Sequence, residues 1–177
     1  LEVKPSCWHA DFQIDPGPRV TIADISIKLT GAAQNDAELQ QLRSNLLSAS
    51  GQPLRHDHYE TMKSRISALA MARGYLNGDF VEKKLLIDTR QNKAYISLVF
   101  DAHERMRFGE VKVIQDDLNP DIVNKFITFK SNDFYSSDAL AKTHNALSNS
   151  GYFEVVDIRP DTQTSNQTSV PVTVNLF

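Results

Sequence analysis

The sequence predicts an α+β fold made of two tandem units, each in the order strand, helix, helix, strand, strand. Three repeated features support this prediction: a segment that occurs twice, a shift of hydrophobic phase inside that segment, and a Gly-Tyr pair after the second helix. Because the copies lie much further apart than the roughly 20–45 residues of a solenoid repeat, each unit is predicted to be a small domain.

The repeated segment reads FQIDPGPRVTIADISI at residues 12–27 and LVFDAHERMRFGEVKV at residues 98–113. Apolar residues alternate in both copies and then slip by one position at the same point. They are Val20, Ile22, Ile25 and Ile27 in the first copy, and Met106, Phe108, Val111 and Val113 in the second. Alternation with period two predicts a half-buried strand, and the slip of one residue predicts a β-bulge in each copy.

Composition excludes several classes of protein. The chain has 177 residues, of which 41% are hydrophobic and 23% charged, as in ordinary soluble globular proteins. A net charge of −3 with no basic block argues against a nucleic-acid partner. No apolar run approaches the roughly 20 residues of a membrane-spanning helix. Cys7 is the single cysteine and therefore cannot form an internal disulfide.

The chain starts at Leu1, without an initiator methionine or a signal peptide, so we expect it to be part of a longer protein. Alternating apolar residues predict a strand at 7–15, which ends at the Asp15-Pro16-Gly17-Pro18 turn. By the repeat, this strand corresponds to a predicted strand at 94–100. The predicted division is therefore a remnant of a preceding unit, its closing strand plus a linker, at 1–17, followed by one unit at 18–101 and another at 102–177.

Each unit has recognisable helix signals. In the first unit, Asn35 and Glu38 predict a capping box, and Asp57 predicts the N-cap of a second helix that ends at Gly74. The apolar positions expected to face the core are Leu39, Leu42 and Leu46 in one helix, and Tyr59, Met62, Ile66 and Leu69 in the other.

In the second unit, Asn119 is the predicted N-cap and Pro120 the first helical residue. Its first helix is predicted to bury Ile122, Val123, Phe126 and Ile127. A second helix is predicted to begin near Ser137 and to end at Gly151. The Gly-Tyr pairs at 74–75 and 151–152 then lead into predicted strands at 80–88 and 153–159.

Candidate catalytic and metal-binding residues are scarce. His56 and His58, with Asp57 and Glu60 nearby, have the spacing of a zinc or copper site. However, the second unit lacks an equivalent cluster, and Asp57 and Glu60 also have the spacing of a helix-capping pair, which we favour. No nucleophile, phosphate-loop or dinucleotide motif occurs. The sequence therefore predicts that the protein is not an enzyme and that it has no catalytic, metal or cofactor site. The alternative hypothesis is an unrelated enzyme domain with a site between the two units.

The chain resembles the POTRA repeats of the BamA/TamA superfamily of outer-membrane assembly proteins. The resemblance rests on the strand opening at Arg107–Val111, on the Gly-Tyr pairs, and on the Asp15–Arg19 linker that leads into a new first strand. It implies that each unit packs two helices on a three-stranded mixed sheet whose middle strand is the last in sequence. It also implies that a membrane barrel follows residue 177.

Within the superfamily the three-unit TamA family fits best, with BamA-like proteins and two-partner secretion transporters as alternatives. This resemblance implies a non-enzymatic periplasmic module that helps to insert or secrete outer-membrane proteins such as autotransporters. The implied partners are unfolded precursor chains and a TamB-like protein anchored in the inner membrane.

The resemblance also makes the strand after the second helix an edge of its sheet, where an incoming chain can pair by β-augmentation. The candidate partner-binding residues are Val81, Lys83, Leu85 and Ile87 in the first unit, and Phe153, Val155, Val156 and Ile158 in the second. The alternative is that Lys83 and Lys84 protect the first edge from pairing. Since hydrogen-bonding direction alternates along a strand, we expect only one of Val155 and Val156 to point its amide outward. We also expect the short linkers to restrict the angle between adjacent units.

Overall fold

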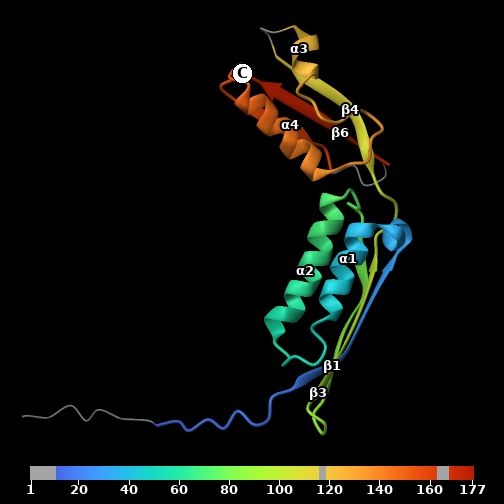
Figure 1. The fold of residues 1–177 in the computed structure, drawn as a ribbon, viewed down its shortest axis with the longest axis vertical. Coiled ribbons are helices and arrows are strands. Elements are labelled where there is room, and N and C mark those ends of the chain that lie inside the picture. The colour runs from blue at the N-terminus through green and yellow to red at the C-terminus, as the bar shows by residue number, and fades with distance from the viewer. Residues whose placement is uncertain (1–10, 116–118, 163–167) are drawn as a thin grey trace, which may run out of the picture.

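The computed structural model describes residues 11–115, 119–162 and 168–177 and shows two bodies stacked end to end (Figure 1). We call them the first unit and the second unit. The first unit contains β1 (Thr21–Thr30), the 3-10 turn η1 (Gly31–Asn35), α1 (Ala37–Leu47), α2 (His56–Ala72), β2 (Asp79–Asp88) and β3 (Lys93–Asp101). The second unit contains β4 (Arg107–Ile114), α3 (Pro120–Asn124), α4 (Ser137–Asn149), β5 (Val156–Pro160) and β6 (Ser169–Leu176).

Each unit has a three-stranded mixed sheet with the last strand in the middle. The strand orders are β1-β3-β2 and β4-β6-β5. The first strand pairs in parallel with the middle strand, and the strand after the second helix pairs with it in antiparallel fashion. The predicted α+β fold class is therefore confirmed.

The repeated phase shift is a β-bulge in both units. The register between the first and middle strands shifts between Ile22 and Asp24 in the first unit, and between Phe108 and Val111 in the second. At the second bulge the two backbones approach closely, since a Cβ on Gly109 would lie 3.0 Å from the Pro171 nitrogen. The bulges thus occupy equivalent positions, as the sequence predicts.

The loop between the helices pairs with the first strand in the same way in both units. The Leu54 amide donates to the Val20 carbonyl at 2.8 Å, and the Tyr135 amide donates to the Met106 carbonyl at 2.9 Å. Val20 and Met106 are equivalent positions of the repeated segment. The duplication is therefore visible in individual hydrogen bonds as well as in the order of the elements.

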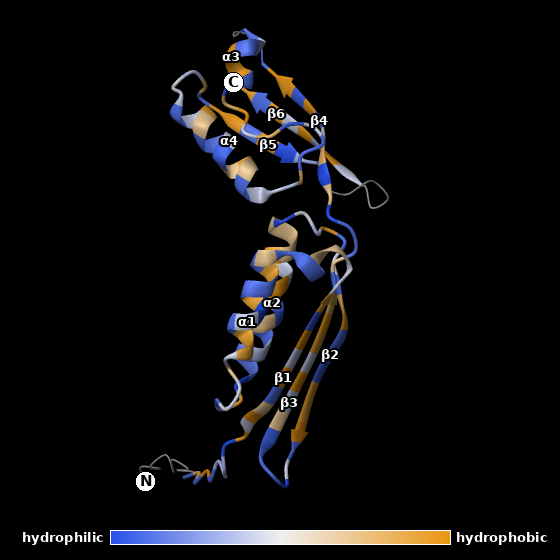
Figure 2. Ribbon diagram, turned by 45° about the vertical axis from the view of Figure 1, so that its right-hand side comes forward, coloured by the Kyte–Doolittle hydropathy of each residue, from blue (hydrophilic) through white to orange (hydrophobic). Residues whose placement is uncertain are grey.

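The helices cover one face of each sheet, and each unit has its own hydrophobic core (Figure 2). In the first unit, alternate residues of β3 are buried in one core with inward residues of α1 and α2, and this core includes Leu98, Leu39 and Ile66. In the second unit, the rings of Phe108 and Phe129 stack at 4.1 Å. Burying a side chain of the size of Leu98 contributes about 2 kcal/mol, so the two cores supply most of the driving force for folding.

Helix starts differ in part from the predictions. The N-cap of α1 is Asp36 and not Asn35, because η1 extends through Asn35 and places the Asp36 carboxylate over the first helical amides. α2 begins at His56, so Asp57 lies inside the helix, where its carboxylate binds Arg55 instead of capping. Asn119 and Pro120 are the N-cap and first residue of α3, as predicted. However, α3 is only 5 residues long, and Phe126 and Ile127 lie beyond it.

The predicted strand at 7–15 is wrong for its described part. Residues 11–15 belong to no strand, and Phe12 and Ile14 are 87% and 82% exposed. An extended segment outside a sheet gains no stability from strand pairing. Residues 7–10 lie outside the described residues.

A buried carboxylate organises the end of the first unit that faces the second. Asp36 Oδ1 accepts the Glu38 and Leu39 amides, while its Oδ2 accepts Arg73 Nε at 2.7 Å and the Tyr75 hydroxyl at 3.0 Å. Burial alone would raise the pKa of Asp36, but the hydrogen bonds from Arg73, Leu39 and Tyr75 outweigh it and hold the pKa below its ordinary value. Burial and the same carboxylate raise the pKa of Tyr75 to about 12.

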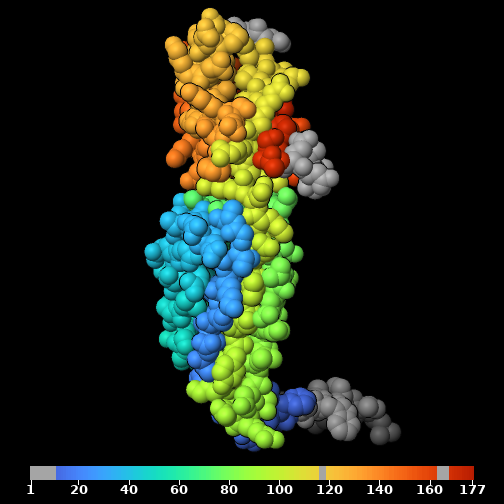
Figure 3. All heavy atoms as spheres, turned by 90° about the vertical axis from the view of Figure 1, so that its right-hand side faces the viewer, coloured from blue at the N-terminus to red at the C-terminus, as the bar shows by residue number. Residues whose placement is uncertain are grey.

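The two units are joined where α2 ends. The carbonyl of Gly74 accepts the Met106 amide at 2.8 Å, and Leu76 packs against the core of the second unit. The C-terminal end of α2 points towards the N-terminal end of α4 (Figure 1), an orientation in which the two helix dipoles attract. The contact between the units is continuous in the space-filling view (Figure 3).

Replacing Asp36 with asparagine should destabilise the protein by about 2 kcal/mol at pH 7, because an amide cannot accept the charge-assisted bond from Arg73. The folded-state pKa of Asp36 is lowered, so its contribution is complete above the ordinary value of 3.8 and is lost as the pH falls through the folded-state pKa. Urea unfolding of both proteins at neutral and acidic pH should therefore show the difference shrinking in acid. Asp57→Asn, which removes an exposed carboxylate, is the control and should have no measurable effect. A pH-independent difference for Asp36→Asn would contradict this assignment.

Gly74 and Gly151 form a matched pair for a second prediction. Both have positive φ, at 92° and 73°, but a Cβ on Gly74 would lie 2.9 Å from the Tyr135 carbonyl oxygen, whereas a Cβ on Gly151 would meet nothing. Alanine at either position should cost about 1 kcal/mol through the backbone conformation. Gly74→Ala should cost roughly 2–3 kcal/mol in total, because the second unit must also shift. Equal losses in thermal unfolding would show that the close approach at Gly74 is unimportant.

Candidate functional site: the open sheet edges

The candidate site follows from the position of the last strand. Because β3 and β6 lie in the middle of their sheets, β2 and β5 are edge strands. An edge strand presents backbone amides and carbonyls that have no partner within the sheet. Both predicted interaction strands therefore occupy edges.

The hydrogen bonds of β5 determine which amides face outward. The Val155 amide donates to the Phe177 carbonyl at 3.0 Å, and the Phe177 amide donates to the Val155 carbonyl at 3.1 Å. At the other end of β5, the Asp161 amide donates to the Pro171 carbonyl at 2.9 Å. Since such pairs recur at every second residue of an antiparallel ladder, the backbone groups of Val156, Ile158 and Pro160 point away from β6.

This pattern answers the question raised by Val155 and Val156. The outward amide belongs to Val156, and the Val155 amide is already used by Phe177. Ile158 adds a second outward amide. Pro160 has no backbone N–H. Because its backbone faces away from β6, no hydrogen bond between β5 and β6 is lost, and Ile158 is the last residue of β5 with an outward amide.

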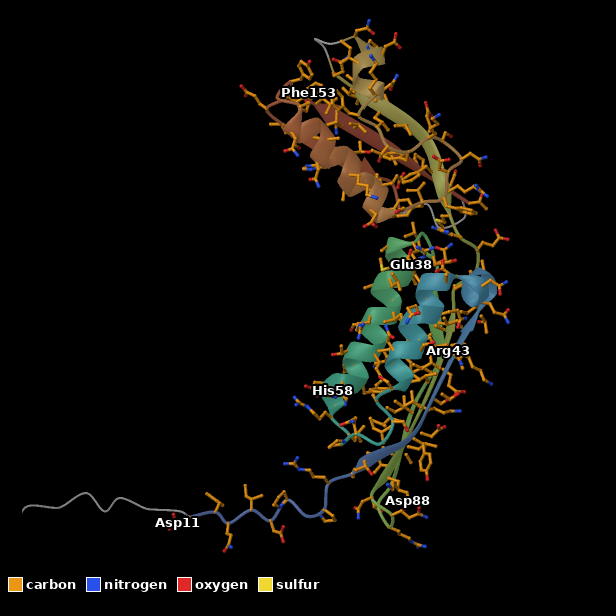
Figure 4. All side chains as sticks on the ribbon, in the orientation of Figure 1. Asp11, Glu38, Arg43, His58, Asp88 and Phe153 are labelled. Atoms are coloured by element: carbon orange, nitrogen blue, oxygen red, sulfur yellow. The ribbon has the colours of Figure 1, made fainter. Side chains whose placement is uncertain are left out.

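The predicted residues of the second unit do not all belong to the edge. Val156 and Ile158 are half-buried side chains of β5 that pack on the second core. Phe153 and Val155 precede β5, which spans Val156–Pro160, although the two backbone bonds between Val155 and Phe177 continue its ladder by one residue. Phe153 packs on the core, and Val155 is 52% exposed. Figure 4 places Phe153 at the end of the second unit that is remote from the first.

The edge of β2 is longer but contains an irregularity. The register against β3 shifts between Phe80 and Glu82, so Val81 is the extra residue of a bulge and is 67% exposed. Lys83, Leu85 and Ile87 pair opposite residues of the helix-covered face of β3. Leu85 packs on the first core, while Ile87 is 48% exposed.

Charged side chains lie along β2. Glu82 accepts the Ser97 hydroxyl at 2.6 Å and pairs with Lys84 at 3.2 Å, and these two contacts hold the pKa of Glu82 below its ordinary value. Lys83 lies over the Phe80 ring at 5.9 Å. A bulge and edge lysines are features that natural sheets use against unwanted pairing. The physical features of β2 therefore favour β5 as the more accessible edge.

Sequence reasoning missed Tyr152, which with Val155 forms an apolar rim next to β5. Tyr152 is 59% exposed and Val155 is 52% exposed, although Tyr75, the equivalent of Tyr152, is only 2% exposed. Tyr152 makes an edge contact with Phe126 at 6.3 Å. The sequence signal, a Gly-Tyr pair after a helix, is the same in both units. It does not encode the contacts of Tyr75 with Asp36 and Arg105.

The histidine cluster shows the contacts of a helix start. Arg55 binds Asp57 at 2.7 Å, and His56 lies 3.8 Å from Glu60. Figure 4 shows His58 at the far end of α2, away from the second unit. Among the described residues, no group of three or more histidine, cysteine or acidic side chains is placed to hold a metal ion.

No helix in the described ranges combines the length and hydropathy that a membrane crossing requires.

A family comparison covers the second unit. Residues 106–176 match the family model of POTRA, described as the surface antigen variable number repeat. This match begins one residue before β4 and ends with β6.

Solved structures with similar folds cover both units. The crystal structure of Haemophilus influenzae BamA POTRA3-5 is 22% identical, with 86% of this chain and 60% of that chain covered and a TM-score of 0.57. BamA from Haemophilus ducreyi lacking POTRA domains 1-3 is 18% identical, with 88% and 29% covered and a TM-score of 0.64. POTRA1-2 of the periplasmic domain of Omp85 from Anabaena is 13% identical, with 89% and 95% covered and a TM-score of 0.50.

Proline substitutions should separate the inward from the outward amide. Val155→Pro removes the bond to Phe177 and should destabilise the second unit by about 3 kcal/mol. Val156→Pro removes an amide that points away from the sheet, so its cost should be about 1 kcal/mol, mainly from altered packing. Urea unfolding followed by circular dichroism measures both. The reverse order of the two losses would show that the assignment of the outward amide is wrong.

At these levels of identity the solved structures establish the fold, and the chain spans 60% and 29% of the two BamA structures that it matches. Residues 106–176 are thus similar to the POTRA family, and the first unit has the same strand order as this segment.

Proposed function

We propose that this chain is the periplasmic interaction module of a TamA-like outer-membrane assembly factor and that it handles precursor proteins by β-augmentation. The observation that carries the proposal is the open edge of β5, where the backbone of Val156 and Ile158 faces away from the sheet. The POTRA match of the second unit supports the general role. The module is proposed to act without catalysis and without a cofactor.

The proposed mechanism uses the main chain for affinity. An extended client segment pairs with the outward amides of Val156 and Ile158 and with the carbonyls of Val156, Ile158 and Pro160. Such pairing depends little on the client sequence, which suits a protein that handles many precursors with alternating apolar and polar residues. Pro160 limits the length of the paired region at one end.

Side chains around the edge add a preference for apolar clients. Tyr152 and Val155 provide an exposed apolar rim beside the N-terminal end of β5. On the open face, Asp157 binds Arg159 at 2.7 Å and Asn175 at 3.2 Å, so these charges are already satisfied. A client segment can therefore bury apolar side chains against the rim without leaving an unpaired charge there.

The clients in this proposal are unfolded outer-membrane protein precursors, including autotransporters. A TamB-like protein anchored in the inner membrane is the second proposed partner. A TamA-like role rather than a BamA-like or two-partner secretion role rests on the sequence resemblance and on the proposed division of the chain at residues 1–17, 18–101 and 102–177. The solved relatives include BamA and Omp85 proteins, so the broader role in outer-membrane assembly has the wider support.

A peptide-binding experiment tests the proposal. The probe is a fluorescent synthetic peptide of about ten residues with alternating apolar and polar side chains, and the matched probe has N-methyl groups on alternate backbone nitrogens. Val156→Pro should weaken binding of the first peptide by about tenfold, since at least one main-chain hydrogen bond is lost. Val156→Thr keeps the amide and the strand propensity and should retain binding.

The N-methylated peptide should bind weakly to every variant, because its side chains are unchanged but its donors are missing. If folded Val156→Pro binds the unmodified peptide as well as the parent does, the β5 edge is not the site. Equal affinity for the N-methylated and the unmodified peptide would contradict β-augmentation in general.

A further inference from the structure

Arg105 occupies the point at which the two units meet. Its Nε donates to the carbonyl oxygen of Arg73 at 2.6 Å, at the C-terminal end of α2. Its guanidinium lies 5.9 Å from the centre of the Tyr75 ring and 4.6 Å from that of the Phe134 ring. Tyr75 belongs to the first unit and Phe134 to the second. One side chain of the linker therefore contacts both units.

The surroundings hold both faces of this contact in place. Tyr75 is fixed by its bond to Asp36, which also binds the Arg73 side chain at 2.7 Å. Arg107 also lies near Phe134, 4.0 Å from the ring centre, and donates to the Asn132 carbonyl at 2.6 Å. A planar guanidinium that lies near two rings and is bonded to a helix-terminal carbonyl makes a directional contact that lysine cannot reproduce.

Recesses flank the contact on both sides. One, of about 460 Å³, is lined by Glu38, Leu69 and Arg73 of the first unit and by Asp138, Ala139 and Lys142 of the second. The other, of about 480 Å³, lies between Asn35 and Asp36 on one side and Arg107 and Phe134 on the other. Figure 4 shows Glu38 at the end of the first unit that faces the second. The recesses leave room for the units to rock about their remaining contacts, which include those of Gly74 and Leu76.

We propose that Arg105 is a latch that fixes the angle between the two units, and that its release lets the units rock into the flanking recesses. The backbone bond from Met106 to Gly74 serves as the pivot, beside Leu76, which packs on the second core. The latch sets the direction of the β5 edge relative to the first unit. It does not depend on client binding at β5, so either proposal can fail alone.

Distances between two spin labels test the latch in the full chain. Labels are placed on cysteines introduced at Ser64 in α2 and Asn145 in α4, both exposed, with Cys7 replaced by serine. Pulsed electron resonance should give a narrow distance distribution for the parent protein. Arg105→Gln should broaden the distribution by about twofold, because the stacking and the bond to Arg73 are lost.

The matched control is Arg43→Gln. Arg43 also donates from Nε to a backbone carbonyl, that of Ile27 at 2.7 Å, but within the first unit, so its loss should leave the width unchanged. Phe134→Leu should also release Arg105, because it removes the ring that Arg105 contacts while keeping every linker residue. It should broaden the distribution in the same direction.

Circular dichroism confirms that each variant remains folded. Parent-like narrow distributions for both folded Arg105→Gln and Phe134→Leu would overturn the proposal. Equal broadening by Arg43→Gln would overturn it as well, because the effect would then not come from the junction.

Discussion

The parallel pairing of the first strand with the last strand decides the architecture of each unit. It places β3 and β6 in the middle of their sheets, where they are paired on both sides. The strand that follows the second helix then has a partner on one side only. The open edge is thus a consequence of topology and not of any special residue, which is why it can arise in both units of a duplicated chain.

Equivalent positions of the duplicated scaffold have different surroundings. In the first unit the Gly-Tyr pair is buried at the junction, where Tyr75 is bonded to Asp36 and lies 5.9 Å from the Arg105 guanidinium. In the second unit the equivalent Tyr152 is 59% exposed beside β5. The local sequence therefore does not by itself determine the burial of this tyrosine.

The sequence predicts the order of the elements and both bulges, because each depends on local patterns that occur twice, whereas the middle position of the last strand was implied only by the family resemblance. The N-cap of α1 could not be assigned from sequence, because Asn35 and Asp36 are adjacent and both can cap. The predicted strand at 7–15 has an adequate pattern, but in the described residues 11–15 it lacks a partner strand. Pattern alone cannot supply the neighbour that a strand requires.

The sequence could predict which strand forms the candidate site, but not which backbone amides of that strand face outward. Alternation requires that Val155 and Val156 differ in direction, but only the bond between Val155 and Phe177 shows which amide is free. The sequence raises Lys83 and Lys84 as possible protection of β2, whereas the bulge at Val81 is visible only through its register against β3. Long-range pairing carries this information, and a single strand does not contain it.

Residue-resolved amide hydrogen exchange tests the central claim most directly. In the free protein, the amides of Val156 and Ile158 should exchange rapidly, while those of Val155 and Asp161 should be protected by their bonds to the carbonyls of Phe177 and Pro171. On addition of an unfolded outer-membrane protein precursor, Val156 and Ile158 should become protected. Protection of these two amides before any client is added, or no change in them when a client binds, would contradict an open and functional β5 edge.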